Sequence, residues 1–151
     1  MPIQLLSIKE LLEDKKDFIN HPLCQDSLYM SIDFYKKVGF HEPWICYYVQ
    51  KDNILVGSAA FKGQPKDGTV EIAYGTFLPY QHQGIGTRIC NSLVELALKT
   101  DPLVRVTART LPEENFSTRI LKRNGFELAG LVNDPEDGDV WDWGFQNSTK
   151  M

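Results

Sequence analysis

One segment of the chain has residue types that suit binding of an anion, the seven residues from Gln81 to Thr87. Two of them, Gly84 and Gly86, stand where a long helical pattern begins. The first turn of a helix presents N–H groups without intrahelical partners, and the helix dipole is positive there. Because glycine has no Cβ, a ligand can approach these amides closely. The segment is therefore predicted to form a cradle of backbone amides for a phosphate or diphosphate group.

The residues around the two glycines disfavour the common nucleotide-binding loops. A Walker loop ends in Gly-Lys-Ser or Gly-Lys-Thr, whereas this segment continues Gly86-Thr87-Arg88. A dinucleotide-binding loop requires a third glycine, and none follows at the required spacing. A protein that prefers ATP or NAD is therefore a remote alternative. Taken alone, the two glycines also fit an ordinary glycine-rich helix start.

Hydrophobic periodicity predicts the elements that hold this loop in place. Apolar residues at helical spacing predict four helices, over residues 8–19, 23–37, 84–100 and 114–124. Apolar or alternating runs predict six strands, over residues 44–50, 54–61, 69–78, 104–110, 126–132 and 140–145. Local hairpins come first and helical crossovers later, so we expect a mixed α/β fold in which helices cover the sheet.

Composition points to a single globular domain and against several classes of partner. Of the 151 residues, 42% are hydrophobic and 24% are charged, so we expect one domain over residues 1–151. The net charge of −4 disfavours nucleic acid, and no apolar run approaches the ~20 residues of a membrane helix. The N-terminus lacks an export signal, so a cytoplasmic location is expected. The three cysteines and three histidines are scattered, so no metal site is expected.

Several motifs along the chain resemble those of the GNAT superfamily of N-acetyltransferases. Residues 81–86 read Gln-His-Gln-Gly-Ile-Gly, and the family's loop reads Gln/Arg-x-x-Gly-x-Gly/Ala. Residues 70–74 resemble the family's fourth strand, and residues 114–126 resemble its Asn-x-x-Ser…Gly-Phe segment. Residues 134–143 are similar to the tail of the branch related to the ribosomal-protein acetyltransferases. The resemblance implies a mixed, mostly antiparallel sheet of six to seven strands flanked by four helices.

The resemblance also implies an activity and a set of cofactor contacts. The expected enzyme transfers an acetyl group from acetyl-CoA to a primary amine of a small molecule or a protein N-terminus, by direct attack in a ternary complex. No metal is implied. The implied cofactor-binding residues are Phe77, Leu78, Gln81, His82, Gln83, Gly84, Ile85, Gly86, Thr87 and Asn115. Either Glu114 or Asn115 occupies the family's asparagine position, because Asn115 stands two residues before Ser117 rather than three.

Glu71 and Ser117 are the predicted catalytic residues. A free alkylamine has a pKa near ~10, so a base must take its proton at neutral pH. Glu71 is the only charged residue between Val70 and Leu78, and the family often places a base there. The alternative is a solvated glutamate on an open strand face. Ser117 has helix capping as its default role, and the family adds contact with the pantetheine arm or the sulfur.

The family's fourth strand suggests how the thioester is held. By resemblance, a backbone amide near Phe77 would hold the oxyanion. Gly75 is predicted to mark a bulge that frees backbone groups, with a simple packing glycine as the alternative.

One departure from the family pattern concerns the general acid. Many members carry a tyrosine five residues before the Phe of Gly-Phe, and here that position is Leu121. Tyr74 and Tyr80 are candidate substitutes, although a structural role is the simpler interpretation of each. Leu121 also supports an alternative function, a non-catalytic acyl-CoA-binding sensor.

The acceptor is expected to bind near the first two predicted helices and the mouth of the sheet. Four aromatic residues are candidates to line this pocket, with a core role as the alternative: Tyr29, Phe34, Tyr35 and Trp44. An acidic group could attract a cationic amine or simply be solvated: Asp134, Glu136, Asp137, Asp139 and Asp142. Residues 81–125 carry a net charge of +3, so the rest of the chain carries −7. The remaining candidate partner is a second copy of the chain, as a homodimer.

Overall fold

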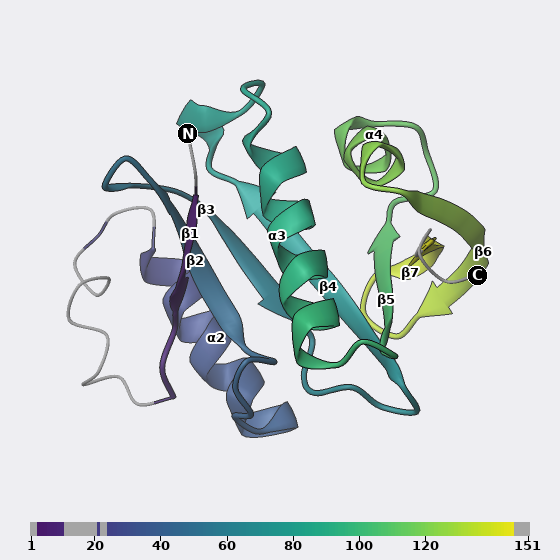
Figure 1. Cartoon of the computed structure of the whole chain (residues 1–151), viewed down its shortest axis with the longest axis horizontal. Coiled ribbons are helices and arrows are strands. Elements are labelled where there is room, and N and C mark those ends of the chain that lie inside the picture. The colour runs from purple at the N-terminus through teal and green to yellow at the C-terminus, as the bar shows by residue number, and fades with distance from the viewer. Residues whose placement is uncertain (1–2, 11–20, 22–23, 147–151) are drawn as a thin grey trace.

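The computed structural model describes residues 3–10, 21 and 24–146, which form one seven-stranded sheet with helices on both faces (Figure 1). The strand order is β1-β2-β3-β4-β5-β7-β6. The strands are β1 Gln4–Ser7, β2 Cys46–Lys51, β3 Ile54–Phe61, β4 Thr69–Thr76, β5 Arg105–Thr110, β6 Phe126–Asp134 and β7 Gly138–Phe145. The α-helices are α2 Gln25–Val38, α3 Ile85–Thr100 and α4 Phe116–Arg123, and a short 3-10 helix, η2, spans Leu78–Tyr80.

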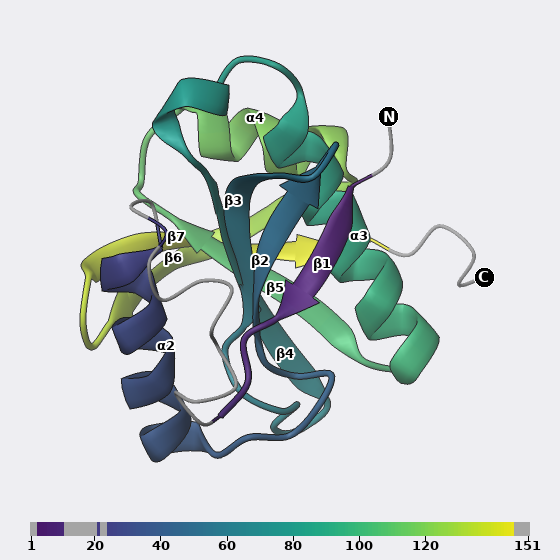
Figure 2. The same cartoon turned by 90° about the vertical axis from the view of Figure 1, so that its left-hand side faces the viewer.

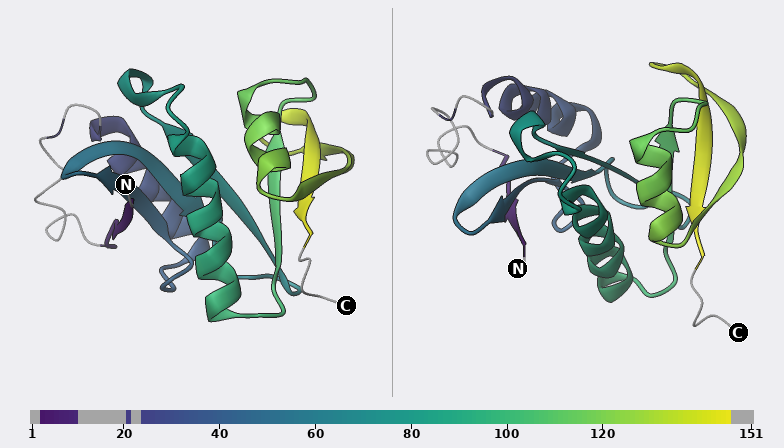
Figure 3. Two further views of the ribbon diagram at one scale, coloured as in Figure 1. Left: turned by 45° about the horizontal axis from the view of Figure 1, so that its top comes forward. Right: turned by 90° about the horizontal axis from the view of Figure 1, so that it is seen from above.

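The sheet is mixed and mostly antiparallel, as predicted. Strands β4 and β5 are parallel, and every other neighbouring pair is antiparallel. Helix α2 covers one face of the sheet, while α3 and α4 cover the other (Figures 2 and 3). A parallel pair requires a crossover connection, and α3 supplies it between β4 and β5.

The N-terminal region differs from the sequence expectation. Residues Gln4–Ser7 form an edge strand that pairs with Tyr47–Gln50 of β2, and periodicity had not predicted this strand. It was missed because its four residues are too few to show an alternating pattern. The predicted first helix covers residues 8–19, of which 11–19 lie outside the described residues. The described part of the chain therefore holds three α-helices of the four that were predicted.

Helix α3 buries the apolar stripe that its spacing predicts. Ile85, Ile89, Leu93 and Ala97 are each at most 1% exposed. On β5 the predicted alternation is also observed, since Val106 and Ala108 are buried and Arg105 and Arg109 are not. The sheet and α3 therefore share one apolar core, and the polar side chains of β5 lie on the opposite face of the sheet from α3.

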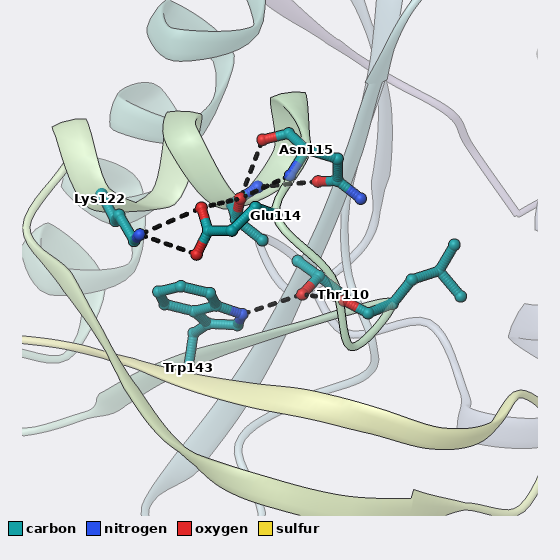
Figure 4. A network of polar contacts seen from close by, with 7 residues as sticks. Thr110, Glu114, Asn115, Lys122 and Trp143 are labelled. Atoms are coloured by element: carbon teal, nitrogen blue, oxygen red, sulfur yellow. Dashed lines mark hydrogen bonds and ion pairs between the residues drawn. The ribbon is translucent and has the colours of Figure 1, made fainter.

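Trp143 of β7 anchors the C-terminal hairpin beneath α4 (Figure 4). Its side chain is 1% exposed, and its indole Nε1–H donates a 3.0 Å hydrogen bond to Thr110 Oγ1 on β5. Above it, Asn115 caps α4: its Oδ1 accepts from the Thr118 amide at 3.1 Å, and Thr118 Oγ1 accepts from the Asn115 amide at 2.9 Å. This capping box fixes the start of α4.

Replacement of Trp143 by phenylalanine should lower the free energy of unfolding by about 1–3 kcal/mol, because a buried hydrogen bond and part of the core volume are lost. Urea denaturation followed by circular dichroism measures this change. Trp141→Phe is a control on the same strand, since Trp141 is only partly buried. Equal losses in the two variants would contradict an anchoring role for the Trp143–Thr110 bond.

Candidate active site

The loop from Gln81 to Gly84 leads from η2 into α3 with an unusual backbone. His82 and Gly84 have φ angles of +67° and +78°, in the region that favours glycine. The first intrahelical bond of α3 runs from the Arg88 amide to the Gly84 carbonyl, at 3.3 Å. The amides of Ile85, Gly86 and Thr87 lie before this bond and are the donors that an N-terminal turn leaves for a ligand.

The two glycines of the loop have different structural roles. A Cβ built at Gly84 would meet no atom within 4 Å, so it would project into open space in front of the helix start. A Cβ at Gly86 would lie 2.7 Å from Ile120 Cδ1, so Gly86 permits close packing of α3 against α4. Asn124 Nδ2 donates to the Thr87 carbonyl at 3.2 Å and ties the same two helices together.

A cavity of about 460 Å³, here called the loop cavity, lies between this helix start and α4. Seven of the predicted site residues line it: Gln81, His82, Gly84, Ile85, Gly86, Thr87 and Ser117. Tyr80, Phe116, Ile120 and Arg123 complete its wall, together with Tyr74, Gly75 and Thr76 of β4. The cavity offers amide donors and a cationic side chain, which fit the diphosphate of coenzyme A.

Four predicted cofactor contacts do not line the loop cavity: Phe77, Leu78, Gln83 and Asn115. Leu78 is 81% exposed, and β4 ends at Thr76 rather than continuing to Leu78 as predicted. Asn115 caps α4 through Thr118, so its side-chain oxygen is already engaged. Glu114 forms an ion pair with Lys122 at 3.0 Å (Figure 4).

Strands β4 and β5 separate beside this cavity. Their pairing covers only Thr69–Ile72 of β4, whereas β3 pairs with β4 as far as Thr76. In an antiparallel pair, every second residue of a strand is hydrogen-bonded to the neighbouring strand. Phe77, directly after β4, is one of these residues, since its amide donates to the Val56 carbonyl of β3 at 2.8 Å. The backbone groups of Gly75 and Phe77 therefore face β3, and the amides of Tyr74 and Thr76 face the gap beside β5.

This arrangement refines one prediction and corrects another. The Phe77 amide donates to the Val56 carbonyl, so the free amide near Phe77 is that of the neighbouring Thr76. The register between β3 and β4 is continuous through Gly75, so Gly75 does not mark a bulge. The strands open instead because β4 runs past the end of its pairing with β5 at Ile72↔Ala108. The carbonyl of Thr76 accepts from Gln81 Nε2 at 3.2 Å, which links this gap to the loop.

A second cavity of about 590 Å³, here called the α2 cavity, lies between α2 and the sheet. Tyr74 and Gly75 line both cavities, so the two spaces meet at these residues. Ala73 and Glu71 continue the lining along β4, and Met30 and Phe34 face them from α2. The β6–β7 turn closes the far end with Asp134, Pro135 and Glu136.

Glu71 sits in a network of charges in the α2 cavity. Its side chain is 21% exposed, and its Oε2 lies 3.2 Å from Lys62 Nζ. Its Oε1 lies 3.9 Å from Arg109 Nε on β5. Arg109 in turn contacts Asp134 at 2.8 Å and Asp142 at 3.7 Å. Glu71 is therefore not the isolated solvated glutamate of the alternative interpretation.

Asp134 accepts several hydrogen bonds within this network. The amide of Glu136, the Arg109 side chain and the amide of Asp137 lower its pKa from 3.8 to about 2. Its Oδ1 accepts from the amides of Glu136 and Asp137 at 2.8 and 3.2 Å, and its Oδ2 accepts from Arg109 Nη1. The carboxylate thus fixes the β6–β7 turn against β5.

The depressed pKa of Asp134 predicts a loss of stability in acid. Because the pKa of Asp134 is lower in the folded state, its carboxylate stabilises the fold at pH values above the unfolded-state pKa of about 3.9. This stabilisation is lost as the pH falls toward 2. Denaturation of wild type and Asp134→Asn between about pH 5 and pH 2 checks this. The Asn variant should show a shallower decline across that window. Parallel declines in the two proteins would contradict the assignment.

The predicted acceptor aromatics mostly lie elsewhere. Phe34 lines the α2 cavity, but Tyr29 is 52% exposed and does not. Tyr35 is buried and donates to the Ile8 carbonyl at 2.7 Å, so it belongs to the core. Trp44 packs edge-on against Phe61, with 5.0 Å between ring centroids.

The predicted acidic group is only partly at the α2 cavity. Asp134 and Glu136 line this cavity, and Asp142 pairs with Arg109. Asp137 and Asp139 do neither.

Sequence reasoning missed the partners of Glu71 and part of the loop cavity. Lys62 stands in a loop region and Arg109 on β5, so only the sheet register brings them to Glu71. Phe116 forms a T-shaped contact with His82, with 4.5 Å between centroids, and carries Arg119 over its ring at 4.8 Å. Phe116 could have been predicted to line the loop cavity because it stands next to Ser117 in the sequence motif.

The position of the family's tyrosine is filled by a core residue, since Leu121 is 1% exposed. Tyr74 and Tyr80 both line the loop cavity. Burial raises the pKa of Tyr74, and its hydroxyl, beside the Cys90 thiol, has no hydrogen-bond partner among the described residues. Tyr74 is therefore suited to remaining protonated and unsuited to giving up a proton.

No helix in the described ranges is long and apolar enough to cross a membrane.

Comparison with known proteins agrees with this geometry. An alignment model described as an acetyltransferase (GNAT) domain matches residues 5–127. An uncharacterized N-acetyltransferase of Bacillus subtilis strain 168, YjdG, is 33% identical over 92 residues, or 60% of this chain. The match covers 53% of YjdG, so the chain spans about half the length of this curated relative.

Two solved structures share the fold at low identity. A chimera of the spermidine N-acetyltransferase SpeG from Vibrio cholerae and hSSAT superposes with a TM-score of 0.72 at 13% identity, over 99% of this chain and 98% of that one. RimL, a ribosomal alpha-N-protein acetyltransferase in complex with coenzyme A, gives 0.68 at 17% identity, over 94% and 92%. Because the match to residues 5–127 spans most of the sequence, the chain belongs to the GNAT acetyltransferase family.

Proposed function

We propose that the protein is an acetyl-CoA-dependent N-acetyltransferase that acts on a primary amine of a small molecule or a protein N-terminus. The observation that carries the proposal is the meeting of two cavities at Tyr74 and Gly75. One cavity has a cradle of amides suited to a diphosphate, and the other contains the carboxylate of Glu71. Two substrates can therefore meet across β4 and react directly, without an acetyl-enzyme.

The loop and the strand gap would hold the acetyl donor. The amides of Ile85, Gly86 and Thr87 would bind the diphosphate, with Arg123 on the opposite wall of the loop cavity. The pantetheine arm would lie along the gap between β4 and β5, where the amides of Tyr74 and Thr76 point. One of these two amides, rather than that of Phe77, would stabilise the oxyanion. Ser117 lines the same cavity and would contact the arm.

Glu71 would accept the proton of the attacking amine through water. Glu71 and Gly75 lie four positions apart on one face of β4, which is roughly 13 Å at about 3.3 Å per residue. This span exceeds the reach of a glutamate side chain, so one or more water molecules in the α2 cavity would relay the proton. Lys62 and Arg109 hold the carboxylate on the cavity side of the strand.

Thiol release from acetyl-CoA in the presence of amines tests the function. We expect release that depends on the amine, together with a mass increase of one acetyl group on the amine. Calorimetric titration with coenzyme A should show one site per chain. Failure to bind coenzyme A would refute the proposal, because the cradle would then have a different ligand or none.

The buried Leu121 favours one second candidate, a non-catalytic acyl-CoA sensor. In that role the loop cavity binds acetyl-CoA, but the α2 cavity receives no amine. Tight binding of acetyl-CoA, with no acetylated product in a cell extract by mass spectrometry, would select the sensor over the enzyme.

A further inference from the structure

The two ends of the α2 cavity differ in chemistry and are well separated. At one end Tyr74 and Gly75 open onto the loop cavity. At the other end Glu71 lies beside the β6–β7 turn with Asp134 and Glu136. Because Gly75 and Glu71 are roughly 13 Å apart along β4, an occupant that touches both ends must be long.

The stretch of the α2 cavity between these two ends is lined mostly by apolar side chains. Ala59, Ala60 and Ala73 line it from the sheet, and Met30 and Phe34 line it from α2. Such walls favour methylene groups, since burying apolar surface is the main favourable term for a neutral segment. Hydroxyl groups also line the cavity, but those of Ser31, Tyr47 and Tyr48 already donate to backbone carbonyls. An alkyl chain therefore fits this stretch better than a polar backbone, whose amides would need partners of their own.

The far end carries an unbalanced negative charge. Six charged side chains gather there, two basic and four acidic, for a net charge of −2: Lys62, Arg109, Glu71, Asp134, Glu136 and Asp142. Ion pairs engage five of them. Glu136 forms no ion pair with any residue that the structure describes, although it lines the cavity.

The position of Glu136 is set by Arg109 through Asp134. Arg109 Nη1 holds one oxygen of Asp134, and the other oxygen accepts the backbone amide of Glu136 at 2.8 Å. These bonds fix the backbone of Glu136, an exposed residue that lines the α2 cavity. Arg109 is a positioning residue, and Glu136 is the group available to a ligand.

Building on the proposed function, we propose that the acceptor is an elongated alkylamine with a second positive charge, which Glu136 binds at the far end of the α2 cavity. The reacting nitrogen then lies at Tyr74 and Gly75, and the methylene chain lies against the alanines. The excess negative charge outside residues 81–125 also favours the approach of a cation.

Acetylation of matched amines tests this assignment, with diaminohexane and diaminobutane compared with hexylamine and butylamine. The measured quantity is the ratio of kcat/KM for each diamine to that of its monoamine. We expect a ratio above one for wild type, larger for the longer pair and smaller at high salt. Glu136→Gln should lower the ratio by about threefold to fivefold, the size expected for a solvent-exposed ion pair. Asp137→Asn is the matched control, since it removes the same charge from the same turn outside the cavity.

Each result separates this assignment from the proposed function. If monoamines are acetylated but the ratio is near one, or if Glu136→Gln and Asp137→Asn change it equally, the dicationic acceptor is wrong and the enzyme assignment stands. If no amine yields product although coenzyme A binds, both are wrong. As a single variant, Arg109→Lys should lower the diamine-to-monoamine ratio of kcat/KM. Added to Glu136→Gln, it should leave that ratio unchanged, which a purely structural effect would not produce.

Discussion

Replacement of Glu71 by glutamine is expected to lower kcat for amine acetylation by about 10²–10⁴-fold, the usual contribution of a general base. Glutamine keeps the size of the side chain but cannot accept a proton. Arg109 retains Asp134 and Asp142 as partners in this variant, so the sheet should stay folded. Steady-state thiol release measures kcat, and calorimetry with coenzyme A should give the wild-type affinity because Glu71 does not line the loop cavity.

Glu113→Gln is the control for this result, because it removes one exposed carboxylate away from both cavities. Its kcat should match that of wild type. A Glu71→Gln enzyme with wild-type kcat would show that Glu71 is a structural partner of Lys62 and Arg109. The base would then have to be sought among other groups of the α2 cavity.

Replacement of Gly84 by alanine should weaken coenzyme A binding by about tenfold to a hundredfold, as expected when charge-assisted hydrogen bonds are lost. The added methyl group would point into the open space before α3, where the proposed diphosphate would approach the amides. A positive φ of 78° also costs an L-residue roughly 1–2 kcal/mol, so the loop would relax away from its cradle geometry. Calorimetric titration measures the loss of affinity.

Gly68 offers a closely matched control for the backbone effect. Its φ is +75°, and a Cβ built there also meets no atom within 4 Å, but it lines neither cavity. Gly68→Ala and Gly84→Ala should therefore lose similar stability in thermal denaturation, while only Gly84→Ala loses affinity for coenzyme A. Equal affinities in the two variants would place the diphosphate somewhere other than the Gly84 loop.

Local pattern predicted most of the fold. Helix α3 and strand β3 follow from their apolar spacing, and both are observed within one residue of the expected bounds. The β2–β3 turn was also predictable, because Asp52 and Asn53 tolerate the positive φ angles that they adopt. Strand β1 was not, since a four-residue edge strand is specified by its partner β2 rather than by its own sequence.

The candidate site was predictable only where it is contiguous in sequence. The backbone geometry of the loop from Gln81 to Thr87 depends on its own glycines, and most of its residues line one cavity. Glu71 was predicted as a site residue because it is a lone charge in an apolar strand. Its contacts with Lys62 and Arg109 depend on how three strands align, which no local pattern encodes. The same holds for the gap between β4 and β5, which was attributed to Gly75 but arises from strand register.

The short pairing between β4 and β5 has a consequence for local unfolding of the domain. Only four residue pairs, from Thr69↔Arg105 to Ile72↔Ala108, join the β1–β4 half of the sheet to the β5–β7 half. Amide hydrogens on both sides of this junction should exchange with solvent through a shared partial unfolding event below the global free energy. A cofactor that spans the two halves would bind the closed form alone, so its presence should slow deuterium uptake on β4 and β5 together.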